Sequence, residues 1–113
     1  MFGSVAQIQY NDGKLLAPAS PSHYTIEFMD DGQVSIRADC NQVLGSFTEE
    51  GSSLAIDLGP TTLAACPPAS IDQDYLRALQ EASIYFFQEG ALFIDIRLDT
   101  GTMRFSRRGD RAL

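Results

Sequence analysis

The two cysteines, Cys40 and Cys66, are the residues of this chain that could most directly carry out chemistry. A thiol acts as a nucleophile when a base lies within hydrogen-bond reach and its pKa is lowered. Asp39 and Asn41 flank Cys40, and His23 is the lone histidine. His23 lies in a Pro- and Ser-rich stretch, where it is expected on the surface, and no pattern brings it to either sulfur. We therefore predict no catalytic residue, and a thiol-dependent enzyme ranks last among our functional alternatives.

The same cysteines could instead form one disulfide or remain as two buried free thiols. Cys40 ends one predicted strand and Cys66 ends another extended segment, so the sulfurs could approach each other across a sheet. We favour the disulfide, because closing a loop of about 25 residues would stabilise the fold by roughly 3–4 kcal/mol. Neither cysteine lies in a CxxC motif, and a single histidine makes a four-ligand zinc site unexpected. We expect neither a metal nor a cofactor.

The size and charge of the chain narrow the classes of partner. Its 113 residues fit a single domain, 1–113, and 44% of them are apolar. Lysine and arginine number 8 against 15 acidic residues, and a net charge of −7 disfavours nucleic acid. No apolar run reaches the ~20 residues of a membrane-spanning helix. No signal peptide is visible, a pattern that a cytoplasmic protein, a trimmed mature protein and an excised domain would share.

Acidic or amide residues followed by glycine recur along the chain, which is typical of tight hairpin turns. Such turns are predicted at 11–13, 30–32, 49–51, 89–90 and 99–101. Short alternating or apolar runs predict strands at 5–10, 24–28, 34–38, 43–48, 54–58, 84–88, 92–98 and 102–106. Residues 15–23 are expected to form a loop, and 61–66 a short extended segment. The pattern predicts a mainly β (α+β) fold, a curved antiparallel sheet or small β-barrel-like fold of about eight short strands.

One helix is predicted at 71–82, where it would plug one side or end of the sheet. Ser70 followed by Gln73 matches a capping box, and Asp72 and Asp74 fall in the first turn, where the helix dipole favours acids. Apolar residues recur at helical spacing. They are Ile71, Tyr75, Leu79 and Ala82, with Leu76 beside them.

The strands after the helix contain a candidate binding patch, made of Tyr85, Phe87 and Phe93. Their predicted core residues are Phe86, Leu92, Ile94, Ile96, Leu98, Met103 and Phe105. If Phe86 faces the core, alternation turns Tyr85 and Phe87 to the other side of the sheet. The patch is then either buried under the N-terminal strand or loop, or exposed as an apolar patch or pocket mouth.

Several polar residues favour structural roles. Asn41 is expected to cap local amides, and Gly45 to mark a bulge or close packing. The acids Asp30, Asp31, Glu49 and Glu50 lack the spacing of a calcium loop and are expected to be solvated turn residues. Arg104, Arg107, Arg108 and Arg111 hold half of the positive charge, and residues 108–113 are expected to form a flexible tail.

Three segments together resemble a known family. Residues 24–34 read YTIEFMDDGQV, 38–47 read ADCNQVLGSF, and 61–68 read TTLAACPP. In this order they are similar to the META domain family of HslJ-like bacterial heat-shock proteins, and the resemblance covers about residues 5–107. Leu63 stands where the family commonly has Met, and the Trp of the first strand is missing here. The family motif falls on Asp39, Cys40, Asn41, Gly45, Ala65, Cys66 and Pro67.

The resemblance implies a β-barrel-like fold with a packed helix, a link to stress response and no enzymatic activity. Such domains often occur on secreted or lipid-anchored bacterial proteins, so we expect a periplasmic, cell-surface or secreted location. The predicted function is a non-catalytic envelope or surface binding or scaffold module, whose partner is an unknown protein or apolar ligand. The alternative is a small apolar-ligand or lipid carrier with a cavity between sheet and helix.

Overall fold

The computed structural model describes residues 3–62 and 64–106. Its regular elements follow the predicted hairpins closely. The strands are β1 (Ser4–Tyr10), β2 (Leu15–Leu16), β3 (Tyr24–Phe28), β4 (Gln33–Ala38), β5 (Asn41–Glu50), β6 (Ser53–Thr61), β7 (Ala82–Gln88), β8 (Ala91–Ile96) and β9 (Gly101–Ser106). The helix α1 spans Asp72–Gln80, and short 3-10 turns occupy Pro21–His23 and Arg97–Asp99.

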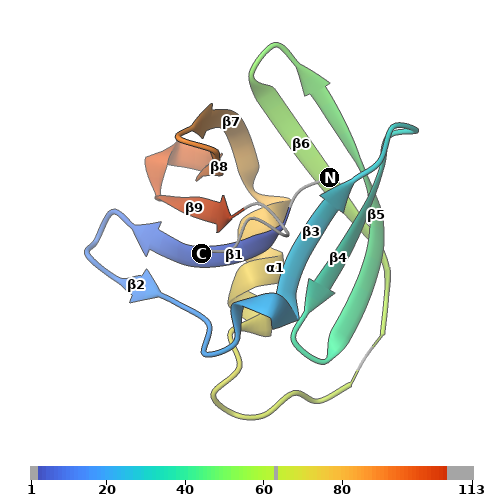
Figure 1. The fold of residues 1–113 in the computed structure, drawn as a ribbon, viewed down its shortest axis with the longest axis vertical. Coiled ribbons are helices and arrows are strands. Elements are labelled where there is room, and N and C mark those ends of the chain that lie inside the picture. Colours follow the sequence, from blue (N-terminus) through green and yellow to red (C-terminus); the bar gives the residue numbers. More distant parts are fainter. Residues whose placement is uncertain (1–2, 63, 107–113) are drawn as a thin grey trace.

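The strands form a closed antiparallel barrel (Figure 1). Neighbours in sequence pair from β3 through β9, and β1 closes the ring by pairing with both β3 and β9. The eight-stranded ring carries β2 as an extra strand on β1. The mainly β, barrel-like fold predicted from the hairpin pattern is therefore confirmed.

The barrel consists of two walls joined at two narrow seams. Strands β3–β6 form one wall, and β7–β9 with β1 form the other, with α1 between them in the view of Figure 1. Within each wall the pairing runs along most of the strands, as between β8 and β9. The seams each have a single registered pair, Ser4 with Thr25 and Ser53 with Ile84. The walls can therefore diverge between the seams.

Helix α1 closes one end of the barrel, the end with the turns that follow β4 and β8. Tyr75 and Leu79 are fully buried, so this helix face completes the core. The Tyr75 hydroxyl donates a hydrogen bond to the Thr25 carbonyl at 2.9 Å, and its ring meets Tyr24 edge-on. Burial raises the pKa of Tyr75 well above its usual value. The predicted helix is confirmed in place, although Ala82 already belongs to β7.

The start of the helix differs from the predicted capping box. The Ser70 hydroxyl accepts the Asp72 N–H at 3.1 Å, whereas the Gln73 amide turns to the Asp72 carboxylate. The Tyr24 hydroxyl accepts the Ile71 N–H and contacts the Ser70 hydroxyl. A side chain from β3 thus acts together with Ser70 at the start of the helix.

Leu98 was predicted in the core, and this prediction is wrong. Strand β8 ends at Ile96, and the chain turns through Arg97–Asp99 to reach β9. Leu98 takes left-handed backbone there, with φ 64°, and its side chain is 86% exposed. The Arg97 N–H bonds the Glu81 carbonyl at 2.7 Å, which fixes the turn against the end of α1.

Phe86 was also placed in the core, and it lies on the outer face of β7 with 39% of its surface exposed. The reason is an irregularity at Ser83. Ala82 pairs with Ile96 but Ile84 pairs with Asp95, so one extra residue sits in β7. A bulge of this kind shifts the inward–outward alternation by one residue. Ala82 is buried, and the inward positions that follow fall on Tyr85 and Phe87.

Smaller differences concern the loops. Residues 15–23, expected as a loop, contain the two-residue strand β2 and the Pro21–His23 turn. The predicted tail at 108–113 lies outside the described residues, as do Leu63 and Arg107. Within the described part of the chain, α1 is too short to cross a membrane, and no other helix qualifies.

Candidate functional site

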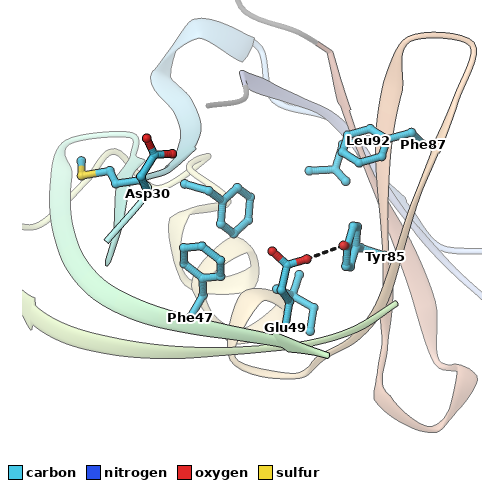
Figure 2. A pocket seen from close by; sticks show the side chains of 9 residues that line it. Asp30, Phe47, Glu49, Tyr85, Phe87 and Leu92 are labelled. Atoms are coloured by element: carbon cyan, nitrogen blue, oxygen red, sulfur yellow. Dashed lines mark hydrogen bonds between the residues drawn. The ribbon is translucent and has the colours of Figure 1, made fainter. Parts of the chain in front are cut away.

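A pocket of about 420 Å³ opens at the end of the barrel opposite α1 (Figure 2). The hairpin turns after β3, β5 and β7 lie at this end, and every lining residue is in or near one of them. The pocket thus occupies the space where the two walls diverge. Its lining residues are Phe28, Met29, Asp30, Phe47, Glu49, Leu54, Tyr85, Phe87 and Leu92.

Aromatic rings from both walls form much of the pocket. Phe28 of β3 and Phe47 of β5 meet edge to face, with ring centroids 4.9 Å apart. On the opposite wall, Tyr85 and Phe87 of β7 form a second edge-to-face pair at 6.0 Å. Phe87 is 61% exposed, which places it at the mouth. Apolar walls with few polar groups are typical of small-molecule sites.

One polar contact links the two walls inside the pocket. The Tyr85 hydroxyl donates a hydrogen bond to Glu49 Oε2, and Figure 2 shows the two side chains pointing toward each other. This bond to Glu49 raises the pKa of the Tyr85 hydroxyl, and partial desolvation and the Glu49 charge act in the same direction. The main-chain N–H of Tyr85 also bonds the Ser52 carbonyl at 2.9 Å. Tyr85 therefore fastens β7 to the β5–β6 hairpin.

The disulfide lies at the other end of the barrel. Cys40, in the turn after β4, is bonded to Cys66 in the segment between β6 and α1, as favoured from the sequence. His23 Nδ1 lies 3.7 Å from the Asp39 carboxylate, and the disulfide leaves neither cysteine as a thiol that His23 could activate. Both sulfurs are thus in a covalent cross-link that ties the segment before α1 to the barrel.

Nearly the whole chain matches the model of one protein family. A family model described as META domain matches residues 4–110. The chain belongs to the META domain family. The sequence matches none of the curated proteins with which it was compared.

Two solved structures have a similar fold. An NMR structure of a protein from Burkholderia xenovorans matches with a TM-score of 0.68 and 21% identity, over 94% of this chain and 80% of that one. A crystal structure of a DUF4847 family protein from Bacteroides vulgatus ATCC 8482 matches with a TM-score of 0.65 and 17% identity. That match covers 74% of this chain and 58% of the other. At these identities the likeness concerns the fold alone.

Asn41 is the central polar residue of the META motif in this chain. Its side chain is 3% exposed, and its Oδ1 accepts hydrogen bonds from the Thr62 hydroxyl at 3.0 Å and the Ala64 N–H at 2.8 Å. Its Nδ2 donates to the Ala64 carbonyl at 3.1 Å. Asn41 therefore holds the segment that leads to Cys66. Its role is structural, as predicted, but it bonds the backbone of Ala64, 23 residues away, instead of capping local amides.

The other motif residues also surround this anchor or the strand after it. Asp39 takes left-handed backbone in the turn before Cys40, with φ 58°. A Cβ on Gly45 would lie 2.3 Å from the Asp57 carbonyl oxygen, where β5 and β6 pair irregularly. This confirms the predicted bulge or close approach at Gly45. Ala65 and Pro67 are exposed on either side of Cys66.

The structure divides the predicted aromatic patch of the META domain. Tyr85 and Phe87 line the pocket, whereas Phe93 stacks on Phe86 on the outer face, with ring centroids 5.0 Å apart and an angle of 4°. The bulge in β7 and the strand alternation account for this division. The pocket residues that sequence reasoning missed are Met29, Phe47, Leu54 and the carboxylates.

Glu49 is exposed to solvent, as predicted, but it is not a turn residue. It lies within β5, opposite Leu54 of β6, and faces the pocket. By contrast, Asp31 acts as a turn residue, because its Oδ1 accepts the Gln33 N–H at 3.1 Å. Strand β5 runs to Glu50, beyond the predicted end at 48, and this longer strand gives Glu49 its place.

Proposed function

We propose that this META domain is a non-catalytic binding module and that the pocket at the open end of its barrel is the binding site. The observation that carries the proposal is the aromatic lining supplied by both walls, at the end that α1 leaves uncovered. A ligand or partner side chain entering there would remove Phe87 and its neighbours from water. Burial of apolar surface at about 25 cal/mol per Å² would supply the affinity.

The absence of catalysis is part of the proposal. Both sulfurs are joined to each other, so neither is available as a thiolate nucleophile. The polar pair inside the pocket, Tyr85 and Glu49, is engaged in a mutual hydrogen bond. These contacts favour a role in holding a ligand over a role in transforming one.

An extracytoplasmic location, at the cell envelope, cell surface or outside the cell, also belongs to the proposal. Disulfides persist in oxidising compartments and are rare in the cytosol. The Cys40–Cys66 bond is compatible with such a location. A role in the stress response remains an expectation from the family.

The carrier alternative uses the same pocket. Its predicted cavity, between sheet and helix, is occupied by the side chains of Tyr75 and Leu79. A carried apolar ligand would therefore sit at the other end, among Phe28, Phe47 and Phe87. Native mass spectrometry of protein purified from cells separates the two roles. A carrier retains a bound small molecule in the spectrum. A module that docks onto a partner protein gives the mass of the chain alone when it is purified without that partner.

Binding of a neutral apolar dye tests the site itself. N-phenyl-1-naphthylamine becomes more fluorescent outside water, so its emission should rise when it enters the pocket. We expect Phe87→Ser to abolish the rise. Phe86→Ser changes the adjacent residue on the outer face of the same strand and should leave the rise intact. Equal dye binding by both variants, or no binding by the wild-type protein, would overturn the proposal.

A further inference from the structure

The aromatic walls of the pocket give it a defined electrostatic character. Phe28 with Phe47 and Tyr85 with Phe87 meet at interplanar angles of 78° and 85°, and all four rings line the cavity. The face of an aromatic ring carries negative electrostatic potential, and it attracts a cation within about 6 Å of the ring centre. Rings on two facing walls can act on one cation together.

A carboxylate lies among these rings. Glu49 Oε2 accepts the Tyr85 hydrogen bond, and Figure 2 shows the other carboxylate oxygen on the side of Phe47. Asp30 adds a second carboxylate at the rim. The lining residues include neither lysine nor arginine. An entering cation would therefore meet its counter-charge inside the pocket, whereas an anion would meet repulsion.

The described basic residues lie elsewhere. Lys14, Arg37, Arg77 and Arg97 lie in or next to elements at the end of the barrel that holds α1. Arg104 is exposed on β9, where it pairs with Phe93 of the outer face. The acids in the turns after β3 and β5 add Asp31 and Glu50 near the open end. Among the described residues, the charged side chains in the turns at the pocket mouth are therefore acidic, which favours positive ligands.

We propose that the pocket selects small organic cations that carry an apolar or aromatic group, such as quaternary ammonium compounds. This inference rests on the proposed binding function and adds the chemical class of the ligand. A volume of about 420 Å³ suits one small molecule. The rings contact the apolar part and the methyl groups of the cation, and Glu49 neutralises its charge. Fatty carboxylates and anionic lipid headgroups are disfavoured.

Three probes of nearly the same shape test the charge preference on the full chain. Phenyltrimethylammonium is the cation, tert-butylbenzene is its neutral isostere, and benzenesulfonate is the anion. Dissociation constants are measured by protein-observed NMR titration. We expect the cation to bind about tenfold more tightly than tert-butylbenzene, as expected for a partly desolvated cation–π site. Benzenesulfonate should bind more weakly than either.

Matched variants then locate the source of the preference. Glu49→Gln removes the charge but keeps an amide oxygen for the Tyr85 hydroxyl, and it should reduce the advantage of the cation several-fold without changing tert-butylbenzene binding. Glu50→Gln removes the same net charge from the next residue, which does not line the pocket, and should change the ratio little. Phe87→Leu keeps apolar bulk without a ring and should also reduce the advantage.

The results distinguish a failure of the charge preference from a failure of the proposed binding site. Equal affinities for the cation and its neutral isostere would overturn the inference and leave the apolar binding site standing. The same holds if Glu50→Gln lowers the ratio as much as Glu49→Gln. If none of the three probes binds, the proposed function fails together with the inference.

Discussion

The Tyr85 hydroxyl donates a hydrogen bond to the Glu49 carboxylate and thereby joins the two walls of the barrel inside the pocket. The neighbouring seam has the single registered pair Ser53 with Ile84. This contact therefore contributes to both the fold and the proposed binding site. It fastens β7 to β5, and it places a polar pair inside the cavity. Its disruption is expected to alter the pocket before the rest of the fold.

Titration of Tyr85 checks this contact. Glu49 raises the Tyr85 pKa above its ordinary value of about 10. We expect Glu49→Gln to lower that pKa toward the ordinary value, because a neutral amide stabilises the protonated hydroxyl less. Residue-resolved NMR across the alkaline range measures the change. Glu50→Gln serves as the control, and an equal shift in both variants would assign the effect to net charge.

The raised pKa of Tyr85 also predicts how the free energy of unfolding depends on pH. A tyrosine whose folded pKa is raised stabilises the folded state below the unfolded value, and this contribution is lost as pH rises through the folded value. The free energy of unfolding of the wild-type protein should therefore fall more steeply above about pH 10 than that of Tyr85→Phe. Urea unfolding at a series of alkaline pH values measures the difference. Parallel curves would contradict the assignment.

Loss of the disulfide should destabilise the fold while the pocket persists. The Cys40–Cys66 bond has a sequence separation of 26, for which the chain-entropy model gives roughly 3–4 kcal/mol. We expect the double variant Cys40→Ser/Cys66→Ser to lower the free energy of unfolding by about that amount. Dye binding by the folded variant should be retained, since the pocket lies at the opposite end. A folded variant without dye binding would show that the two ends are coupled.

Asn41 should matter for stability more than a typical turn asparagine. Asn41→Ala would remove the buried amide that bonds the Ala64 backbone and the Thr62 hydroxyl. We expect a loss of about 2–3 kcal/mol, since three part-buried hydrogen bonds would be lost at about 1 kcal/mol each. Asn11→Ala, an exposed turn position, should change stability by less than about 0.5 kcal/mol. Chemical denaturation measures both, and similar losses would refute the anchoring role.

Gly45 tests the close approach of β5 to β6. An alanine Cβ would lie 2.3 Å from the Asp57 carbonyl oxygen, so the backbone must shift. We expect Gly45→Ala to cost roughly 1–3 kcal/mol, as overpacking usually does. Ser46→Ala on the same strand is the control. A Gly45→Ala protein as stable as wild type would mean that the two strands do not approach so closely.

Sequence patterns predicted much of the fold because its strands, turns and helix are each indicated by residues close together in the chain. Alternation at residues 24–28 matched β3, and the spacing of Tyr75 and Leu79 identified the buried face of α1. Glycine turns marked the hairpins. The disulfide could be favoured because both cysteines end extended segments. Each of these predictions depends only on neighbouring residues and on the regular spacing of a strand or a helix.

The pocket was less accessible from the sequence because it depends on non-local register. The bulge at Ser83 exchanges the faces of Tyr85 and Phe86, and no residue near it in the sequence indicates a bulge. Glu49 resembled a turn acid because only the pairing of β5 with β6 extends the strand that far. Phe28 was predicted inward, but its partner Phe47 lies on another strand, and barrel closure brings them together.

Chemical-shift mapping with N-phenyl-1-naphthylamine tests the central claim, that the open end of the barrel is a ligand site, most directly. On the isotopically labelled full chain, we predict saturable perturbations of Phe28, Phe47, Tyr85 and Phe87, with little change around Arg77 of α1 and the neighbouring Tyr10. Perturbations centred on the helix end, or none at saturating dye, would contradict it.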